Sequence, residues 1–249
     1  MRKKLIVVLV IMIVSLICYM RNVYDIIVRN SRSCVENSSY TSDNIRDIMT
    51  SKKDKVVVID AGHGGNDPGK VGVHNELEKD INLSIAYMLK DKMVDAGFSV
   101  LMTRTSDDGL YNIYDKNKKM SDLRKRVEII NTSEAVCLIS IHQNSFSSSN
   151  ERGAQVFYYN TSELSNKLAK FVQKSMKEYH DVNNTRQEKS NGSYYILKKT
   201  YKPAIIVECG FLSNGEEAYK LTTKKYQESI ATSICNGVVS WANDIIESE

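Results

Sequence analysis

The sequence predicts a single α/β domain with a mostly parallel central sheet that is flanked by helices on both faces. The first observation is that, from Lys55 onward, short apolar runs typical of buried strands alternate with longer segments whose apolar residues recur at helical spacing. The second is composition: 42% of the 249 residues are apolar and 26% are charged, which suits one packed core and argues against wholesale disorder. Strands that alternate with helices are typical of parallel sheets covered on both sides.

In the first half of the expected domain, the sequence predicts two strands and two helices in alternation. Val56–Ile59 is a short β-branched run, as expected for a strand buried on both faces. A helix is expected over 79–96, because apolar residues recur every four positions, and Gly97 ends it. A strand follows over 98–103, and another helix opens at Ser121, whose hydroxyl can cap it.

The second half of the chain continues this alternation. Strands are expected over 136–141, 154–159, 194–197 and 204–207, with a helix over 162–179. A long C-terminal helix over 225–246 closes the domain, since its apolar residues fall at helical spacing. No internal repeat is present, which excludes an array of repeated binding modules.

Residues 1–29 are expected to form an N-terminal signal anchor or signal peptide. A basic start, Met1–Lys4, precedes the apolar run Leu5–Met20, whose 16 residues fall short of the roughly 20 that span a bilayer upright. No small-x-small cleavage motif follows, and Ile17 before Cys18 is unsuited to lipoprotein processing. We therefore favour an uncleaved anchor over a cleaved export signal, and both place the rest of the chain outside the cytoplasm.

The basic charge of the chain is concentrated in this segment. Of 34 basic and 30 acidic residues, six and one respectively lie in the first 32 positions, so the remainder is close to neutral. Basic residues beside an apolar run indicate a membrane surface. The remainder has no basic stripe suited to nucleic acid, so nucleic-acid binding is not expected.

A polar stalk is expected between the anchor and the globular part of the chain. Residues 30–54 are rich in Ser, Asn and Asp and show little periodicity. The folded domain is therefore expected to occupy residues 55–249.

The five cysteines lie at positions 18, 34, 137, 209 and 235 and form no C-x-x-C pair, which argues against a structural zinc site. Their number is odd and their spacing is scattered, which also argues against a disulfide framework. We interpret them as free thiols in the core, where a cysteine behaves as a small apolar residue.

Three of the expected strands end in an ionisable group. His63 follows the first strand closely, His142 follows the strand over 136–141, and Glu208 follows the strand over 204–207. Glu78 lies where the loop after His63 turns into the first long helix. Because the carboxyl ends of parallel strands gather at one edge of a sheet, we expect these groups to lie close together.

The residue types at this edge suit a catalytic metal site. Two imidazoles and a carboxylate are a common ligand set for catalytic zinc, with the fourth position left for water. Zinc lowers the pKa of that water toward about 7, and a further carboxylate, for which Glu208 is suitably placed, then takes its proton. A single histidine after a strand is more often structural, and a lone Glu208 would more often form a salt bridge. The matching positions of four groups favour a catalytic site.

Several motifs extend beyond these four residues. In chain order they are Asp60-Ala-Gly-His-Gly-Gly65, Glu78-Lys-Asp-Ile-Asn-Leu83, Val100-Leu-Met-Thr-Arg104, Leu123-Arg-Lys-Arg126 with Ile130-Asn131, Ile139-Ser-Ile-His-Gln-Asn144, and Pro203-Ala-Ile-Ile-Val-Glu-Cys-Gly-Phe-Leu-Ser-Asn214. In these motifs and their order, the sequence resembles the zinc-dependent N-acetylmuramoyl-L-alanine amidases of the amidase-3 family. The resemblance spans roughly residues 54–245, nearly all of the expected domain.

The resemblance implies roles for the four ionisable residues. His63, Glu78 and His142 would bind Zn²⁺, and Glu208 would be the catalytic acid/base. The implied substrate is peptidoglycan, cut at the amide between the lactyl group of muramic acid and L-alanine.

Neighbouring polar residues offer rival assignments. Glu76 rivals Glu78 as a ligand, although the motif and the position just ahead of the helix favour Glu78. His74 is a weaker rival in the same loop, and we assign His180, which follows a helix, to the surface.

Arg124 and Arg126 are candidates for orienting Glu208 or contacting substrate, and a solvated helix face is an equal alternative. Asn144 is a further candidate for substrate contact. Two departures from the family pattern stand out: Ala61 replaces the usual proline, and Gln143–Phe146 is bulkier than usual, which bears on the wall of the cleft.

The layout most resembles the germination-specific branch of this family in spore formers, because it combines one short anchor with no wall-binding repeats. By that resemblance the protein is extracytoplasmic, in the space between the membranes of the developing spore. It would strip stem peptides from cortex peptidoglycan and so prepare muramic δ-lactam formation by a partner deacetylase. An accessory envelope protein is a further candidate partner, since a compact domain without targeting modules has few means of its own to reach substrate.

Two other readings remain open from the sequence. A vegetative autolysin for cell separation would share the chemistry and differ in timing and place. A non-catalytic wall-binding protein would retain the fold without cleaving the amide.

Overall fold

The computed structural model describes Arg21 and residues 40–51 and 55–247. The expected signal anchor, Arg21 excepted, and the first part of the expected stalk lie outside the described residues. From Tyr40 onward the chain forms one compact unit. None of the helices in this described part has the length and hydropathy that crossing a bilayer requires.

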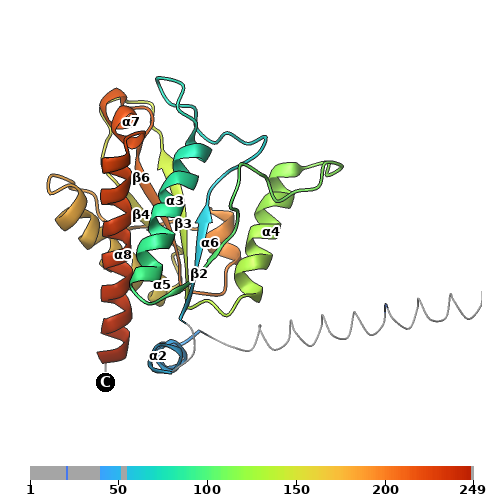
Figure 1. The fold of residues 1–249 in the computed structure, drawn as a ribbon, viewed down its shortest axis with the longest axis vertical. Coiled ribbons are helices and arrows are strands. Elements are labelled where there is room, and N and C mark those ends of the chain that lie inside the picture. The colour runs from blue at the N-terminus through green and yellow to red at the C-terminus, as the bar shows by residue number, and fades with distance from the viewer. Residues whose placement is uncertain (1–20, 22–39, 52–54, 248–249) are drawn as a thin grey trace, which may run out of the picture. The chain divides into compact units, whose positions relative to one another are not determined.

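A six-stranded sheet lies at the centre of this unit (Figure 1). Its strands are β1 Val56–Ala61, β2 Ser99–Met102, β3 Cys137–Asn144, β4 Gln155–Tyr158, β5 Lys189–Ser190 and β6 Ala204–Phe211. The strand order is β2-β1-β3-β6-β4-β5, and every neighbouring pair is parallel except β4 with β6. The expectation of a mostly parallel sheet is therefore confirmed.

Helices cover both faces of the sheet, as expected. One face packs on α3 Glu78–Asp95, α5 Glu163–Ser175 and α8 Lys224–Glu247, and the other on α4 Lys118–Thr132 and α6 Tyr195–Lys199. A π-helical turn, η1 Met176–His180, continues α5, and α7 Gly215–Leu221 follows β6.

Side chains of the central strands alternate between the two faces. On β3 and β6, Ile139 and Val207 enter the larger core cluster, whereas Leu138 and Ile206 enter the smaller one beside α4 and α6. Since a strand repeats every second residue, the even-numbered residues further along these strands share the α4/α6 face. The alternation therefore places His142 and Glu208 on the same side of the sheet.

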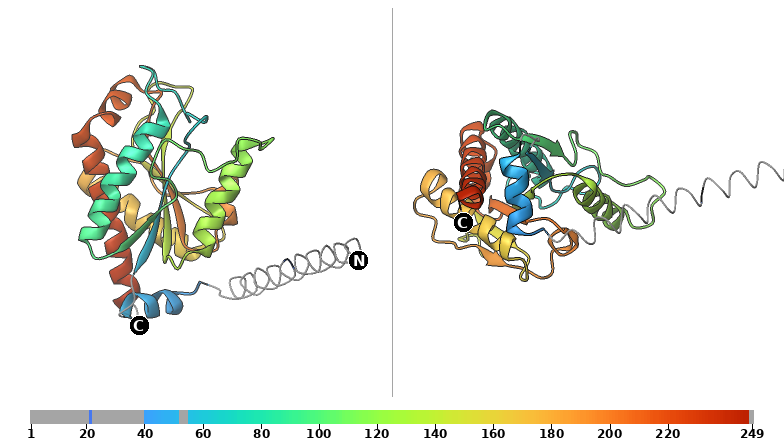
Figure 2. Two further views of the ribbon diagram at one scale, coloured as in Figure 1. Left: turned by 45° about the vertical axis from the view of Figure 1, so that its right-hand side comes forward. Right: turned by 90° about the horizontal axis from the view of Figure 1, so that it is seen from below.

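Part of the expected stalk is a helix of the folded unit. Helix α2, Ser42–Thr50, buries Ile45 and Met49 in the larger core cluster, and Arg46 Nε donates to the carbonyl of Ile245 at 3.0 Å. Figure 2 shows this helix beside the C-terminal end of α8. The expectation of a stalk is therefore wrong for these residues. The helix buries only two apolar side chains, too few to give a periodic signal in the sequence.

The segment expected as a strand over 194–197 is instead helix α6. Asn191 explains the difference, because its side-chain oxygen accepts the backbone N–H groups of Ser193 (2.7 Å) and Tyr194 (3.1 Å) and so turns the chain. Short apolar runs do not distinguish a strand from a buried helix by themselves.

The helix expected to open at Ser121 begins earlier, at Lys118. Asn117 is its cap, since its side-chain oxygen accepts the backbone N–H of Met120 at 3.0 Å. The expected end of α3 at Gly97 is confirmed. Gly97 has a φ of 88°, a left-handed conformation that residues with a side chain rarely adopt and that ends the helix.

The three described cysteines, Cys137, Cys209 and Cys235, are buried and free. This confirms their interpretation as core thiols, whereas Cys18 and Cys34 lie outside the described residues. Burial raises the pKa of Cys137 to about 12, so this thiol stays protonated and unreactive.

Candidate metal centre

The turn after β1 holds His63. The backbone of His63 has a φ of 63°, in the left-handed region, and Gly64 follows with a φ of 132°. Gly62 leaves no space for a side chain, because a Cβ there would lie 2.2 Å from Cε1 of His142. Glycine at this position therefore lets the two rings approach to 5.0 Å between centroids.

A buried ion pair supports this turn. The Asp60 carboxylate accepts hydrogen bonds from the hydroxyls of Thr103 and Ser140, both at 2.6 Å. Arg126 donates to Asp60 Oδ1 at 2.6 Å and to the carbonyl of His63 at 2.5 Å. Although burial alone would raise it, the pKa of Asp60 is lowered to about 2, because Arg126 and the two hydroxyls stabilise the carboxylate. The charged pair thus fixes the backbone from which His63 projects.

Arg104 ties the same turn to the start of α3. Its guanidinium donates to the carbonyls of Ala61 (2.9 Å) and Gly62 (3.1 Å). It also donates to the carbonyl of Lys79 at 2.7 Å. The turn that carries His63 and the helix that begins with Glu78 are therefore held together by one buried cation.

The carboxylate of Glu78, the first residue of α3, lies between two imidazoles. Its Oε1 is 3.2 Å from Nε2 of His63 and 3.0 Å from Nδ1 of His142. Its Oε2 accepts the backbone N–H of Lys70 at 2.7 Å. Although burial opposes it, these hydrogen bonds from the histidines hold the pKa of Glu78 well below its usual range. A buried anion at the start of a helix is also favoured by the helix dipole.

These three side chains suit a zinc ion by chemistry and by spacing. His63, Glu78 and His142 each offer one ligand atom, and these atoms lie within 4.8 Å of one another. Donors around tetrahedral zinc, at bonds of about 2.0–2.1 Å, lie about 3.4 Å apart. The observed separations of 3.0 and 3.2 Å are close to that value.

The far nitrogen of His63 has a carboxylate partner. Its Nδ1 lies 3.0 Å from Oδ2 of Asp67, so Nε2 is the nitrogen that faces Glu78. A carboxylate behind a ligating imidazole fixes the tautomer and the ring orientation. The sequence analysis did not identify Asp67, although it lies four residues after His63 in the same loop.

Glu208 lies on β6, opposite His142 of β3 in the strand register. Its Oε1 accepts the hydroxyl of Tyr194 at 3.3 Å, and its buried Oε2 has no hydrogen-bond partner among the described residues. Burial raises the pKa of Glu208 to about 7; the charge of Glu78 adds to the rise, while His142 opposes it. A carboxyl group with this pKa can take up or release a proton near neutrality.

The rival ligands pair with each other. His74 Nδ1 lies 3.0 Å from Glu76 Oε1, and the backbone N–H of His74 donates to Glu76 Oε2 at 2.9 Å. The side chain of His74 is 58% exposed. Within the described ranges, the one cluster of possible metal ligands contains Glu78 and neither of these residues.

His180 is half-buried, so its assignment to the surface holds only in part. Its ring packs edge-on against Tyr226 at 4.4 Å between centroids, and its Nδ1 lies 3.1 Å from Ser229 Oγ. Burial lowers the pKa of His180 to about 4. The π-helical turn η1 changes the angular spacing at the end of α5 and so rotates this side chain inward.

The three other candidate residues have different surroundings. Arg124 is exposed on α4 and has no hydrogen bond or ion pair with the four central residues in the part of the chain that is described. Arg126 is the arginine that supports the centre, through Asp60 and the turn. Asn144 Oδ1 accepts the N–H of its neighbour Ser145 at 2.7 Å, so the side chain shapes the end of β3.

Sequence analysis missed a polar link between α3 and β3. Asn82 donates to the carbonyl of Gly62 (3.1 Å) and accepts from Gln143 Nε2 (3.1 Å). The backbone N–H of Gln143 in turn donates to Glu78 Oε1 at 3.0 Å. The sequence did contain one indication of this link: Glu78 and Asn82 are four residues apart, which places both side chains on one face of the helix.

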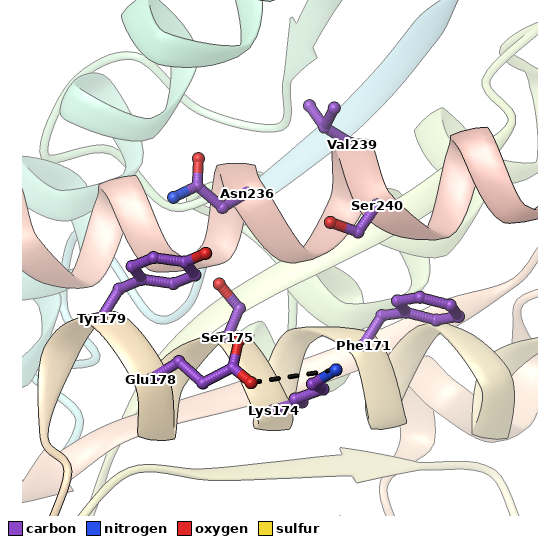
Figure 3. A pocket seen from close by; sticks show the side chains of 8 residues that line it. All are labelled: Phe171, Lys174, Ser175, Glu178, Tyr179, Asn236, Val239 and Ser240. Atoms are coloured by element: carbon purple, nitrogen blue, oxygen red, sulfur yellow. Dashed lines mark ion pairs between the residues drawn. The ribbon is translucent and has the colours of Figure 1, made fainter.

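A groove of about 460 Å³ lies elsewhere, between α8 and the segment formed by α5 and η1 (Figure 3). It is lined by aromatic and polar side chains, including Phe171 and Tyr179, and an ion pair of 3.8 Å between Lys174 and Glu178 lies along its α5/η1 wall. None of the four central residues lines it. The candidate centre is therefore a convergence of side chains at the sheet edge and is separate from this groove.

Comparison with known proteins agrees with this geometry. The sequence profile of a family described as N-acetylmuramoyl-L-alanine amidase matches residues 57–240. The germination-specific N-acetylmuramoyl-L-alanine amidase of Bacillus subtilis (strain 168) is 40% identical over 190 residues, which cover 75% of this chain and 79% of that protein.

Two solved structures extend the similarity to the fold. The CwlD amidase from Clostridioides difficile, solved in complex with the GerS lipoprotein, has a TM-score of 0.74 and 38% identity, covering 76% of this chain and 99% of that chain. An N-acetylmuramoyl-L-alanine amidase from Clostridium difficile 630 has a TM-score of 0.67 and 33% identity, covering 76% and 97%. The profile, the sequence relatives and the fold agree with the motifs, and the chain belongs to the N-acetylmuramoyl-L-alanine amidase family.

Proposed function

We propose that this amidase holds a zinc ion with His63, Glu78 and His142 and uses Glu208 as its acid/base. One observation carries the proposal: two imidazoles and a buried carboxylate offer ligand atoms within 4.8 Å of one another. Beside them lies a second carboxylate, of which one buried oxygen has no hydrogen-bond partner in the residues that the structure describes. Zinc bound there would polarise the carbonyl of the scissile amide and acidify water.

Glu208 is the group that moves protons in this proposal. Its Oε2 takes a proton from the attacking water while a C–O bond forms at the lactyl carbonyl of muramic acid. The same oxygen then delivers the proton to the nitrogen of L-alanine as the C–N bond breaks. A pKa of about 7 suits both transfers near neutral pH.

The remaining buried groups keep the ligands in place. Arg126 and Arg104 hold the carbonyls of the turn that bears His63, and Asp67 orients its ring. Such preorganisation matters because small displacements of a catalytic group reduce the rate strongly.

We further propose that the enzyme acts outside the cytoplasm, held at the membrane by its N-terminal segment, on the cortex peptidoglycan of the developing spore. Similarity to the germination-specific amidase of Bacillus subtilis supports this role. Removal of stem peptides would prepare muramic acid for δ-lactam formation by a partner deacetylase.

An accessory envelope protein is a proposed partner. The CwlD amidase, 38% identical to this chain, was solved in complex with a lipoprotein, which supports a comparable partnership here. Cleavage should then rise when a cell-envelope extract from sporulating cells is added to the purified chain.

Metal analysis of the full-length chain, paired with mass spectrometry of digested peptidoglycan, tests the enzymatic proposal. We expect one zinc per chain and released peptides that begin with L-alanine. His142→Ala should lose both properties, whereas His74→Ala, which removes the exposed histidine of the nearby loop, should retain both. No zinc at saturating metal and no released peptide, with or without envelope extract, would contradict the proposal.

The cortex role has its own test. Spores of a strain that lacks this chain should contain little muramic δ-lactam, and complementation with the wild-type chain should restore it, whereas Glu208→Ala should not. Normal δ-lactam in the deletion strain would show that the amidase acts on the wall of vegetative cells instead.

A further inference from the structure

Tyr194 lies directly beside the carboxylate of Glu208. Its hydroxyl donates to Glu208 Oε1 at 3.3 Å, and no other hydrogen bond to this carboxylate is found among the described residues. The sequence analysis gave Tyr194 no function, because it lay in a segment expected to be a strand. Its position at the start of α6 places it on the same face of the sheet as Glu208.

The position of Tyr194 is fixed by its surroundings. Its ring packs edge-on against Phe157 of β4, with 5.6 Å between centroids and 84° between planes, a favoured aromatic geometry. Its backbone N–H donates to the Asn191 side chain at 3.1 Å, and the N–H of Asn191 donates to the carbonyl of Tyr158 at 2.8 Å. The phenol is therefore anchored to the same sheet that carries Glu208.

A phenol suits this place better than a cation would. A guanidinium beside a buried carboxylate lowers its pKa, as Arg126 does for Asp60, and would leave a poor proton carrier. A neutral hydroxyl instead orients one oxygen without adding charge. Burial, and then the charges of Glu208 and Glu78, raise the pKa of Tyr194 above its usual range, so it remains a donor at neutral pH.

We propose that Tyr194 is a positioning residue for the acid/base of this amidase. Its hydroxyl holds Oε1 of Glu208, which leaves Oε2 free and correctly aimed for proton transfer. This inference rests on the proposed role of Glu208.

A kinetic comparison of two adjacent tyrosines tests the proposal. Tyr195 has no hydrogen bond to Glu208 within the described residues, so Tyr195→Phe is a matched control for Tyr194→Phe. Tyr194→Phe should lower kcat about tenfold, as expected when one hydrogen bond to a charged group is lost from the reacting state. KM and bound zinc should stay unchanged, and Tyr195→Phe should match wild type. An unchanged kcat, or a change confined to KM, would overturn the proposal.

A stability cycle on the zinc-free full-length chain tests the contact without any catalysis. Tyr194→Phe should lower the Tm by about 3 °C in the wild-type background, the scale expected for one lost hydrogen bond in a chain of this size. In a Glu208→Ala background the same substitution should have no effect, since the acceptor is gone. Equal shifts in both backgrounds would overturn the inference. A chain that cleaves no peptidoglycan would instead count against the proposed function, because the cycle reports only on the contact.

Discussion

Two buried carboxylates flank β3 at the same edge of the sheet, and their surroundings differ. Asp60 on β1 is 1% exposed and Glu208 on β6 is 7% exposed. Asp60 is paired with Arg126 and two hydroxyls, and its pKa is lowered to about 2. Within the described part of the chain, the hydroxyl of Tyr194 is the one hydrogen-bond partner of the Glu208 carboxylate, and burial raises the pKa of Glu208 to about 7. Burial acts in the same direction on both groups, so the partners decide the outcome.

In the proposed mechanism, this difference separates a structural charge, Asp60, from a proton carrier, Glu208. Asp60 stays ionised at every physiological pH and, with Arg126, holds the turn that bears His63. Among the described residues, Glu208 has no ion pair with a lysine or arginine, and one of its oxygens has no hydrogen-bond partner. Substitution at the first site should therefore affect mainly stability, and substitution at the second mainly catalysis.

The largest effect is expected for Glu208→Gln. Loss of the acid/base should reduce cleavage by about 10³-fold, within the range usual for such groups. Bound zinc and Tm should stay near wild type, because the amide keeps the shape of the side chain. Peptide release, metal content and thermal unfolding measure the three quantities. Glu76→Gln is the matched control, and near-normal turnover of Glu208→Gln would refute the assignment.

Asp60→Asn should mainly destabilise the fold. It removes one partner of a buried ion pair, which costs about 3–5 kcal/mol in general. The lower end is expected here, because Arg126 keeps Asp122 as a second carboxylate partner. Urea unfolding measures the loss, with the exposed Asp91→Asn as control. A loss no larger than that of the control would mean that the ion pair contributes little to stability.

The stabilising effect of Asp60 should also depend on pH. The pKa of Asp60 in the folded chain, about 2, lies below the ordinary aspartate pKa of about 3.9, so the stabilisation is complete above pH 4 and is lost as the pH falls through 2. The pKa difference corresponds to about 2 kcal/mol. The gap in unfolding free energy between wild type and Asp60→Asn should therefore shrink between pH 4 and pH 2. A gap that stays constant over this interval would contradict the lowered pKa.

The smallest effect is expected for Arg124→Ala. Arg124 is exposed, so its removal should change the unfolding free energy by no more than about 0.5 kcal/mol. Arg126→Ala, two residues on, should by contrast free the turn of His63 and weaken zinc binding by about tenfold or more. Competition with a zinc chelator measures the affinities. Equal losses of zinc affinity in the two variants would mean that Arg124 supports the metal centre as much as Arg126 does.

The sequence by itself determined the fold class and named the four central residues. The β-branched runs of β1, β3 and β6 and the apolar spacing of α3 and α8 specify a parallel sheet between helices, because these periodicities are local. His63, His142 and Glu208 could be singled out because each follows the apolar run of an expected strand, and Glu78 because it opens the first long helix. The structure extends β3 and β6 beyond these runs, so that His142 and Glu208 lie within the strands. Short elements such as α2 and α6 were misjudged, since their few apolar residues carry little periodic signal.

Only the tertiary structure decided which groups meet. The choice between Glu76 and Glu78, and between Arg124 and Arg126, depends on the direction in which each side chain points once helix and sheet have packed. The contrast between Asp60 and Glu208 likewise depends on partners remote in sequence, such as Arg126, which lies 66 positions after Asp60. A pKa in the interior is set by the charges and hydrogen bonds that folding brings within a few ångströms, and those distances are a property of the packed chain.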